Sequence, residues 1–238
     1  MSRLDLFTVP DGATHLTIWT RTSFPAPHTP DFCGERGLSI NGHKLCRNVG
    51  QDYAYVQKKM IPHLGAPIFY SAPDLMSQNT CNEIYMPAAM RTEVSLDEDV
   101  NLMRIEDGAW YDRLRGDGCS FADACETVWE DQDAVFPDLK KKLNKTDEFF
   151  FDLTSLSRAN FRILVGPESL ISMFAARHDQ PDDETQDFMR LGLYSCQSFF
   201  FYHDTTSVRA IVRLDPRASV EAMLKRNTTT RTKQAATG

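Results

Sequence analysis

The sequence predicts an α+β domain in which helices pack on a mixed, mainly antiparallel β-sheet. Two stretches, 148–167 and 199–216, carry this prediction, because each joins an aromatic triplet to a polar turn, a β-branched arm and a proline that can begin a helix. The chain has 238 residues, of which 42% are hydrophobic, so it can build a substantial core without cross-links. We therefore expect two hairpin-plus-helix units, the first of them in the middle of a buried sheet.

The first strand is expected near the N-terminus. Side chains alternate strictly over 16–22, which predicts a strand and places Arg21 near its end. Prolines and glycines recur over 24–50, and the side chains show no sustained helical or strand periodicity. This stretch is therefore predicted to be a long surface loop, a surface excursion from the core. Within it, the Asn-Gly pair at 41–42 favours a short hairpin.

One confident helix and two further strands are expected next. Apolar residues recur at helical spacing over 53–64, and Gly65 stands where a C-terminal glycine cap would. The segments 68–70 and 83–86 are predicted to be strands, and Pro73 in the loop between them excludes a central strand position there. Further helices are expected to begin near Pro87, Ser95, Ser120, Pro167 and Pro216, with an acidic loop over 179–187.

Residues 1–226 are predicted to form a single domain, and 227–238 a flexible, basic, threonine-rich tail. No apolar run is long enough to cross a membrane, and the first residues lack the features of a secretory signal, so the protein is expected to act inside a cell and away from membranes. The net charge is −7, and an acidic body argues against binding of duplex DNA.

The six cysteines are spread thinly along the chain, which favours free thiols in a reducing compartment over disulfides. Four possible zinc ligands nevertheless fall in one loop-rich stretch: His28, Cys33, His43 and Cys46. Their spacing matches no common zinc module. We therefore predict no metal site, with two free thiols and two surface imidazoles as the simpler interpretation.

Several enzyme classes are excluded by inspection. The sequence contains no glycine-rich phosphate loop, no Gly-x-Ser-x-Gly elbow, no His-Glu-x-x-His helix and no Cys-x-x-Cys pair. No cysteine is followed six positions later by arginine, which disfavours a cysteine phosphatase loop. His203, beside Asp204, could be an oriented acid or base, with an exposed turn histidine as the alternative.

Three residues are candidates for a catalytic site: Arg21, Glu83 and Tyr85. Arg21 is the only charge on an otherwise apolar and threonine-rich strand, and an arginine at a strand end can hold a phosphate or a carboxylate with two hydrogen bonds. The alternative for Arg21 is a salt bridge at the sheet edge. Glu83 and Tyr85 could face the same cleft from a second strand, or be an edge carboxylate and a half-buried tyrosine.

Four segments in order, 16–22, 67–75, 83–90 and 148–166, give the chain a resemblance to a known family. It resembles the plast family of Agrobacterium T-DNA oncoproteins, to which RolB and RolC belong. The resemblance implies a protein made in transformed plant cells that alters growth and the response to auxin and cytokinin. One branch of the family is ADP-ribosyltransferase-like, which implies NAD as a cofactor, and Arg21 and Tyr85 match residues of that branch. Hydrolysis of hormone glucosides is the other implied activity.

Two functional hypotheses follow. In the first, a cleft near Arg21 binds or processes a nucleotide, a small-molecule hormone or its conjugate. In the second, the protein is no enzyme, and its acidic segment at 179–187 binds a basic host protein such as a histone or a regulator. The resemblance implies the cytoplasm or nucleus of the host plant cell as the location.

Overall fold

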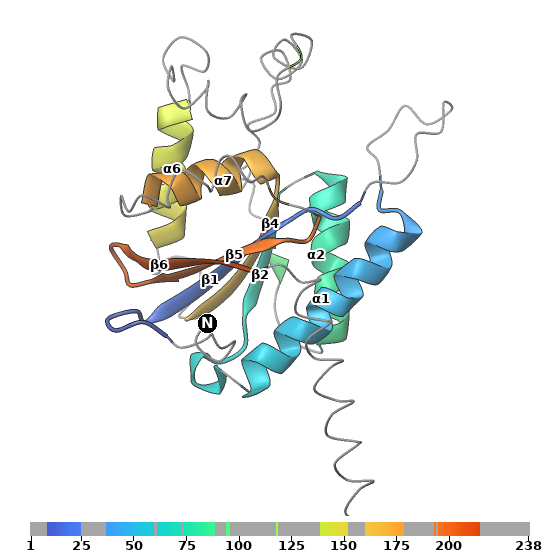
Figure 1. The fold of residues 1–238 in the computed structure, drawn as a ribbon, viewed down its shortest axis with the longest axis horizontal. Helices are drawn as coiled ribbons and strands as arrows, with labels where there is room; N and C mark the ends of the chain where they lie inside the picture. The colour runs from blue at the N-terminus through green and yellow to red at the C-terminus, as the bar shows by residue number, and fades with distance from the viewer. Residues whose placement is uncertain are drawn as a thin grey trace, which may run out of the picture.

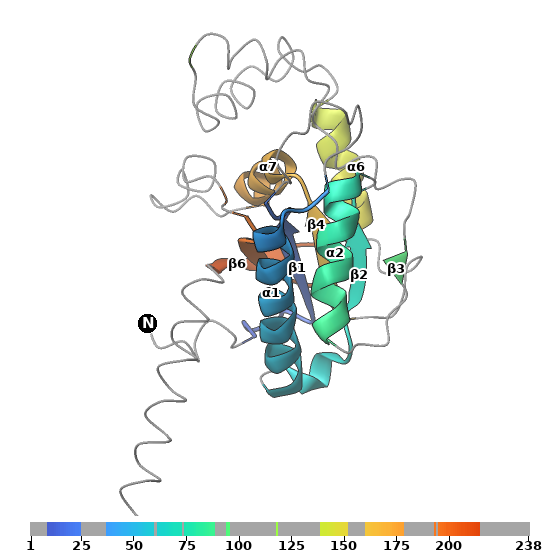
Figure 2. The same ribbon diagram turned by 90° about the vertical axis from the view of Figure 1, so that its right-hand side faces the viewer.

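The computed structural model shows a mixed β-sheet with helices on both faces (Figures 1 and 2). The sheet has six strands in the order β3-β2-β4-β1-β5-β6. Their bounds are β1 His15–Arg21, β2 Ile68–Ser71, β3 Val94–Ser95, β4 Phe161–Gly166, β5 Ser198–His203 and β6 Val208–Leu214. The structure describes residues 9–24, 37–59, 61–72, 74–88, 94–95, 118, 139–151, 160–178, 193 and 195–214.

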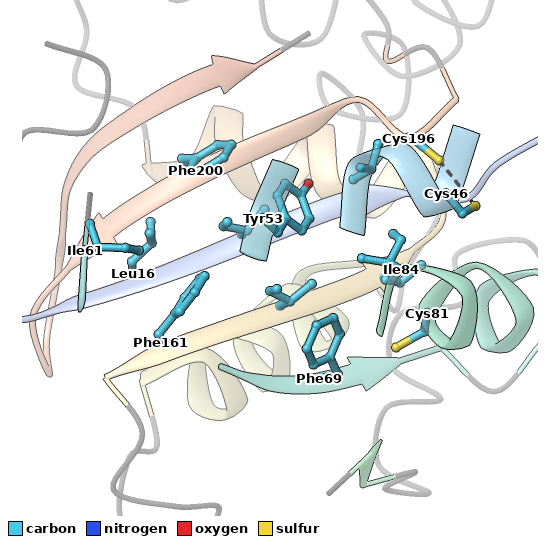
Figure 3. Packing of buried hydrophobic residues seen from close by; sticks show 14 of the residues in the cluster. Leu16, Cys46, Tyr53, Ile61, Phe69, Cys81, Ile84, Phe161, Cys196 and Phe200 are labelled. Atoms are coloured by element: carbon cyan, nitrogen blue, oxygen red, sulfur yellow. Dashed lines mark hydrogen bonds between the residues drawn. The ribbon is translucent and has the colours of Figure 1, made fainter. Parts of the chain in front are cut away.

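Helices α1 (Ile40–Lys59) and α2 (Leu75–Ala88) cover one face of the sheet, and α6 (Leu139–Phe151) and α7 (Glu168–His178) cover the other (Figure 2). Each face has its own apolar core, because successive strand side chains point to opposite sides. Leu16 and Ile18 of β1 belong to the core that α1 and α2 cover, of which Figure 3 draws Leu16, whereas Trp19 belongs to the core under α6 and α7. The predicted strand and its alternation of side chains are confirmed.

The predicted α+β class with a mixed sheet and packed helices is confirmed. The pairings of β1 with β5 and of β5 with β6 are antiparallel, and the second predicted hairpin is therefore present. The pairings of β1 with β4, β2 with β4 and β2 with β3 are parallel. The antiparallel share is thus smaller than the sequence predicted.

The predicted hairpin over 148–166 is wrong. Phe149, Phe150 and Phe151 form the last turn of α6, and only the second arm, Phe161–Gly166, is a strand. Leu143 and Phe150 are both buried and lie two turns apart, so the aromatic triplet continues the apolar stripe of a helix. Every residue of β4 is buried, which is typical of a central parallel strand covered on both faces.

The predicted strand over 83–86 is also wrong, because these residues belong to α2. Asp74 begins this helix, since its carboxylate accepts hydrogen bonds from the N–H and the hydroxyl of Ser77 at 2.8 and 2.7 Å. Cys81 and Ile84 are buried at helical spacing. Pro87, expected to open a helix, lies in the last turn of α2 instead.

Residues 41–42, expected in a hairpin, lie in the first turn of α1. The Ser39 hydroxyl accepts a hydrogen bond from the Gly42 N–H at 3.1 Å and so caps this helix. The helix predicted over 53–64 is confirmed over 53–59, the last part of α1, and a short 3₁₀ helix follows at Pro62–Leu64. Gly65 closes that turn with a φ of 78°, as expected of a glycine cap. Because α1 begins at Ile40, the predicted surface excursion over 24–50 is wrong for residues 40–50.

The helix predicted after Pro167 is confirmed as α7. The helices expected near Ser95, Ser120 and Pro216, the acidic loop and the tail lie outside the described residues, as does the boundary at 226. Within the part of the chain that is described, no helix is long and apolar enough to cross a membrane. Cys46, Cys81 and Cys196 are free thiols, as predicted for them.

Candidate functional site

At the carboxyl ends of β1 and β4, the chain leaves these two neighbouring strands toward opposite faces of the sheet. This edge is therefore the divergence point of β1 and β4. The two strands are parallel neighbours, with Arg21 opposite Gly166. The helix that follows β1 along the chain, α1, covers one face, whereas α7, which follows β4, covers the other (Figure 1). In open sheets with parallel strands, ligands bind in the crevice outside such a point. Arg21, at the end of β1, and Glu168, at the start of α7, meet there.

Arg21 and Glu168 form an ion pair, with 3.0 Å between Nη1 and Oε2. The other carboxylate oxygen of Glu168 accepts a hydrogen bond from the Leu193 N–H. The Arg21 side chain is 33% exposed and that of Glu168 13%, so the guanidinium is the more accessible partner. Arg21 is therefore a partly exposed cation, and Glu168 neutralises its charge from the buried side.

Burial raises the pKa of Glu168 above its ordinary value, although the nearby charge of Arg21, the Leu193 N–H and Arg213 all favour the carboxylate. Arg213 donates a hydrogen bond to the Gln197 side chain at 2.9 Å, and the Gln197 carbonyl accepts one from the Arg21 N–H at 3.0 Å. Glu168 can therefore take up a proton at a higher pH than an exposed glutamate can.

Hydroxyl groups support this edge of the sheet on the α1 side. The Tyr53 hydroxyl lies 2.5 Å from that of Ser198 and 3.0 Å from that of Thr20, and Ser198 also lies 3.1 Å from Thr20. Burial raises the pKa of Tyr53, so its phenol stays protonated. These contacts hold β1, β5 and α1 together just before Arg21.

The chain after Arg21 is also held firmly. The Ser23 hydroxyl donates to the Gly42 carbonyl at 3.0 Å, and its N–H donates to the Thr80 hydroxyl at 3.1 Å. The Thr22 N–H donates to the Gly166 carbonyl at 3.2 Å. Arg21 therefore projects from a backbone that is tied to β4 in the sheet and to the layer formed by α1 and α2.

The structure does not bring Glu83 and Tyr85 to Arg21. Glu83 accepts a hydrogen bond from Arg47 Nε at 2.6 Å and lies 3.0 Å from His43 Nδ1, both on α1. The Tyr85 ring packs edge-on against that of Phe69 in β2, with 5.5 Å between centroids. Their placement differs from the prediction because 83–86 is helical. A catalytic role for these three residues stays a prediction.

His203 is buried, so the alternative of an exposed turn histidine is wrong. Its ring lies 2.9 Å from the Thr17 hydroxyl and 2.8 Å from the Asp204 carbonyl. Burial, followed by the charge of Arg162, lowers the pKa of His203 to about 3, and the ring is neutral near pH 7. It lies at the opposite end of β1 from Arg21.

The described residues include no group of three or more His, Cys, Asp or Glu side chains placed to hold a metal ion. Two of the four possible zinc ligands, His28 and Cys33, lie outside the described residues. Glu168 was not among the residues predicted from the sequence to form the site. Its signal was an acidic residue in the first turn of a helix directly after a strand, and the hairpin interpretation of 148–166 obscured the parallel strand that brings it beside Arg21.

No protein-family model and no curated protein matches the sequence. Solved phosphatase structures do match. A phosphoserine phosphatase from Entamoeba histolytica in complex with 3-phosphoglyceric acid is 16% identical, with 85% of this chain and 98% of that chain covered and a TM-score of 0.55. A variant of the phosphoserine phosphatase in which one histidine is replaced by alanine, in complex with phosphoserine, is 16% identical over 84% and 95% of the two chains, with a TM-score of 0.53. The α-ribazole phosphatase from Shigella flexneri is 10% identical over 84% and 96%, with a TM-score of 0.53.

These matches show that the chain has the fold of these phosphatases. They overturn the resemblance to RolB, RolC and the plast family, because the structural neighbours are proteins of the histidine phosphatase family. The expected role as a T-DNA oncoprotein acting on plant hormone responses is wrong for the same reason, and the alternative of a protein that binds a basic host factor has no support. The expectation of NAD, of an ADP-ribosyltransferase-like fold and of a plant-cell location rested on that resemblance.

Proposed function

We propose that this protein binds phosphate monoesters on a phosphatase fold, with Arg21 as the residue that holds the phosphate. The observation that carries the proposal is the partly exposed guanidinium of Arg21 at the divergence point of β1 and β4. A guanidinium can offer two parallel N–H donors to a phosphate. Two of the phosphatase structures with this fold hold 3-phosphoglyceric acid and phosphoserine, which are small phosphorylated acids.

The charge of the Glu168 carboxylate is expected to affect how tightly a phosphate binds to Arg21. A guanidinium has five N–H donors, and the contact with Glu168 uses Nη1. A phosphate that approaches the exposed side of Arg21 therefore finds donors, but it also meets a carboxylate held nearby by the Leu193 N–H. The site should favour ligands whose binding tolerates or neutralises that carboxylate, and protonation of Glu168 should strengthen binding.

Hydrolysis of the phosphate monoester is the second candidate function. It is favoured by the shared phosphatase fold and by Glu168, a carboxyl group with a raised pKa that could donate a proton to the leaving alcohol. A nucleophile is harder to find. Among the described residues, no imidazole makes a contact with Arg21 or Glu168, and the Ser23 hydroxyl is already donated to the Gly42 carbonyl. We therefore propose phosphate binding in preference to hydrolysis.

The test is calorimetric titration of the full chain with phosphoserine, 3-phosphoglycerate and inorganic phosphate. Arg21→Ala should weaken binding at least about tenfold, because a charge-assisted pair contributes roughly 1.5 kcal/mol or more. Arg177→Ala is the matched control. Its side chain is 30% exposed and pairs with Asp147 at 2.9 Å, much as Arg21 pairs with Glu168. Equal loss in both variants, or none in Arg21→Ala, would overturn the proposal.

Release of inorganic phosphate is measured on the same samples to separate the two candidates. Binding without turnover supports the first. Turnover that is lost in both Arg21→Ala and Glu168→Gln supports hydrolysis at this edge. Turnover that survives Arg21→Ala would contradict both, because the phosphate would then be held elsewhere.

A further inference from the structure

Two cysteines that the proposed function does not use lie side by side beneath the candidate site. Cys46 belongs to α1, and Cys196 lies two residues before Ser198, the first residue of β5. Both side chains are fully buried, and their sulfur atoms lie 3.7 Å apart (Figure 3). The two residues are 150 positions apart in the chain, so the fold alone creates this contact.

The distance is one that a disulfide could close. Bonded sulfurs lie about 2.05 Å apart, so the two atoms must approach by roughly 1.7 Å, which side-chain rotation and a small backbone adjustment can supply. Cys196 stands in a turn with a φ of 59°, in the left-handed region that residues other than glycine rarely occupy.

The pair is also chemically asymmetric. The hydrogen bond between the two thiols lowers the pKa of Cys46, and the same contact raises the pKa of Cys196. The Thr80 hydroxyl adds a further hydrogen bond that favours the thiolate of Cys46. In contrast, burial alone raises the pKa of Cys81 to about 12, and this thiol donates to the Tyr70 carbonyl at 3.8 Å. The thiolate is the reactive form, so Cys46 is the one expected to react first.

We propose that Cys46 and Cys196 are a modification site, at which a peroxide converts the two thiols into an intramolecular disulfide. The Cys46 thiolate attacks one peroxide oxygen, breaks the O–O bond and becomes a sulfenic acid, with release of hydroxide. The Cys196 sulfur then attacks the Cys46 sulfur and displaces the sulfenic hydroxyl group, which leaves as water with the Cys196 thiol proton. The hydroxide from the first step takes up the proton that Cys46 lost when it formed the thiolate. The two thiols lose two electrons in all, and the peroxide is reduced to water.

The cross-link would tie α1 to the backbone that positions Arg21. The Gln197 carbonyl, next to Cys196, accepts the hydrogen bond from the Arg21 N–H at 3.0 Å, and Ser23 adjoins both sulfurs. Both sulfurs are buried, so the oxidant reaches them through local opening, and a small peroxide is better suited than a bulky disulfide. The cross-link can form whether or not Arg21 binds phosphate.

The experiment treats the purified, fully reduced chain with hydrogen peroxide, blocks remaining thiols under denaturing conditions and identifies linked peptides by mass spectrometry without reduction. The expected result is a peptide pair joined through Cys46 and Cys196 that has lost two hydrogen atoms and separates on reduction. Cys81→Ser should leave this pair unchanged, whereas Cys46→Ser and Cys196→Ser should abolish it.

The wild-type measurement decides the matter even if a serine variant fails to fold. Recovery of Cys46 and Cys196 as free thiols after the remaining cysteines have been oxidised would overturn the proposal. So would the finding that either one is linked mainly to another cysteine. Bis-sulfinic acid at both positions without a linked peptide would also overturn it, because the two sulfurs would then have reacted independently.

Discussion

Glu168→Gln is predicted to tighten the binding of sulfate, a divalent anion that mimics phosphate, about tenfold. The substitution keeps the shape of the side chain but removes the negative charge that lies 3.0 Å from Arg21. An anion bound on the exposed side of the guanidinium would lie about 6 Å from Oε2, where the repulsion per pair of unit charges is roughly 3 kcal/mol at an effective dielectric constant of ~20. Solvent screening at Arg21, whose side chain is one-third exposed, reduces this repulsion substantially. We expect the substitution to strengthen binding by a net amount of about 1.4 kcal/mol, which corresponds to tenfold in affinity.

The pH dependence supplies an independent check. Burial raises the pKa of Glu168, so wild-type protein should bind sulfate more tightly as the pH falls from neutrality through the raised pKa and the carboxylate is neutralised. Sulfate keeps its charge over this range, and Arg21 and Arg213 are the cationic side chains that face Glu168. Glu168→Gln should show no such dependence. The same shift lowers the free energy of unfolding as the pH rises through the raised pKa, because the folded state retains a proton that the unfolded state releases.

Calorimetric titration at two pH values measures both effects. Asp147→Asn is the control, because it removes a carboxylate that also pairs with an arginine, Arg177, at 2.9 Å. It should change sulfate affinity little. Repulsion between Glu168 and the bound anion would be ruled out if Glu168→Gln bound sulfate no more tightly than wild type, or if its affinity kept the pH dependence of wild type.

Three further predictions concern stability, each checked by urea unfolding. His203 is held neutral with a pKa of about 3, so the free energy of unfolding should fall by a few kcal/mol as the pH drops from about 6.5 toward 3, and His203→Gln should flatten this part of the profile. Tyr53→Phe should cost only about 1 kcal/mol, since its two hydroxyl partners remain bonded to each other, and a loss several times larger would contradict this. Gly50→Ala should cost about 3 kcal/mol or more, because a Cβ there would collide with the Ile84 carbonyl, whereas Gly37→Ala, with only an ordinary contact, should be nearly neutral.

The local features of the fold were largely predictable from the sequence. The first strand, the hairpin of β5 and β6 and the helix after Pro167 follow from alternation, turn residues and proline placement, which act over a few neighbouring residues. The helix at 83–86 was missed because a short apolar run with one tyrosine fits a strand as well as a helix. The Asp74 cap that decides between them was hidden in a stretch interpreted as a loop.

The candidate site was only half predictable, and the reason is topological. Arg21 could be found because it is a single charge on an apolar strand, and this needs no knowledge of the partner strands. Glu168 could not be paired with it, because the two meet only when β4 inserts between β1 and β2 in parallel register. The spacing of apolar residues within a segment predicts a strand but does not show which other strand pairs with it. A crossover connection places α7 over the face that carries Trp19, and the first residue of that helix then reaches the guanidinium at the end of β1.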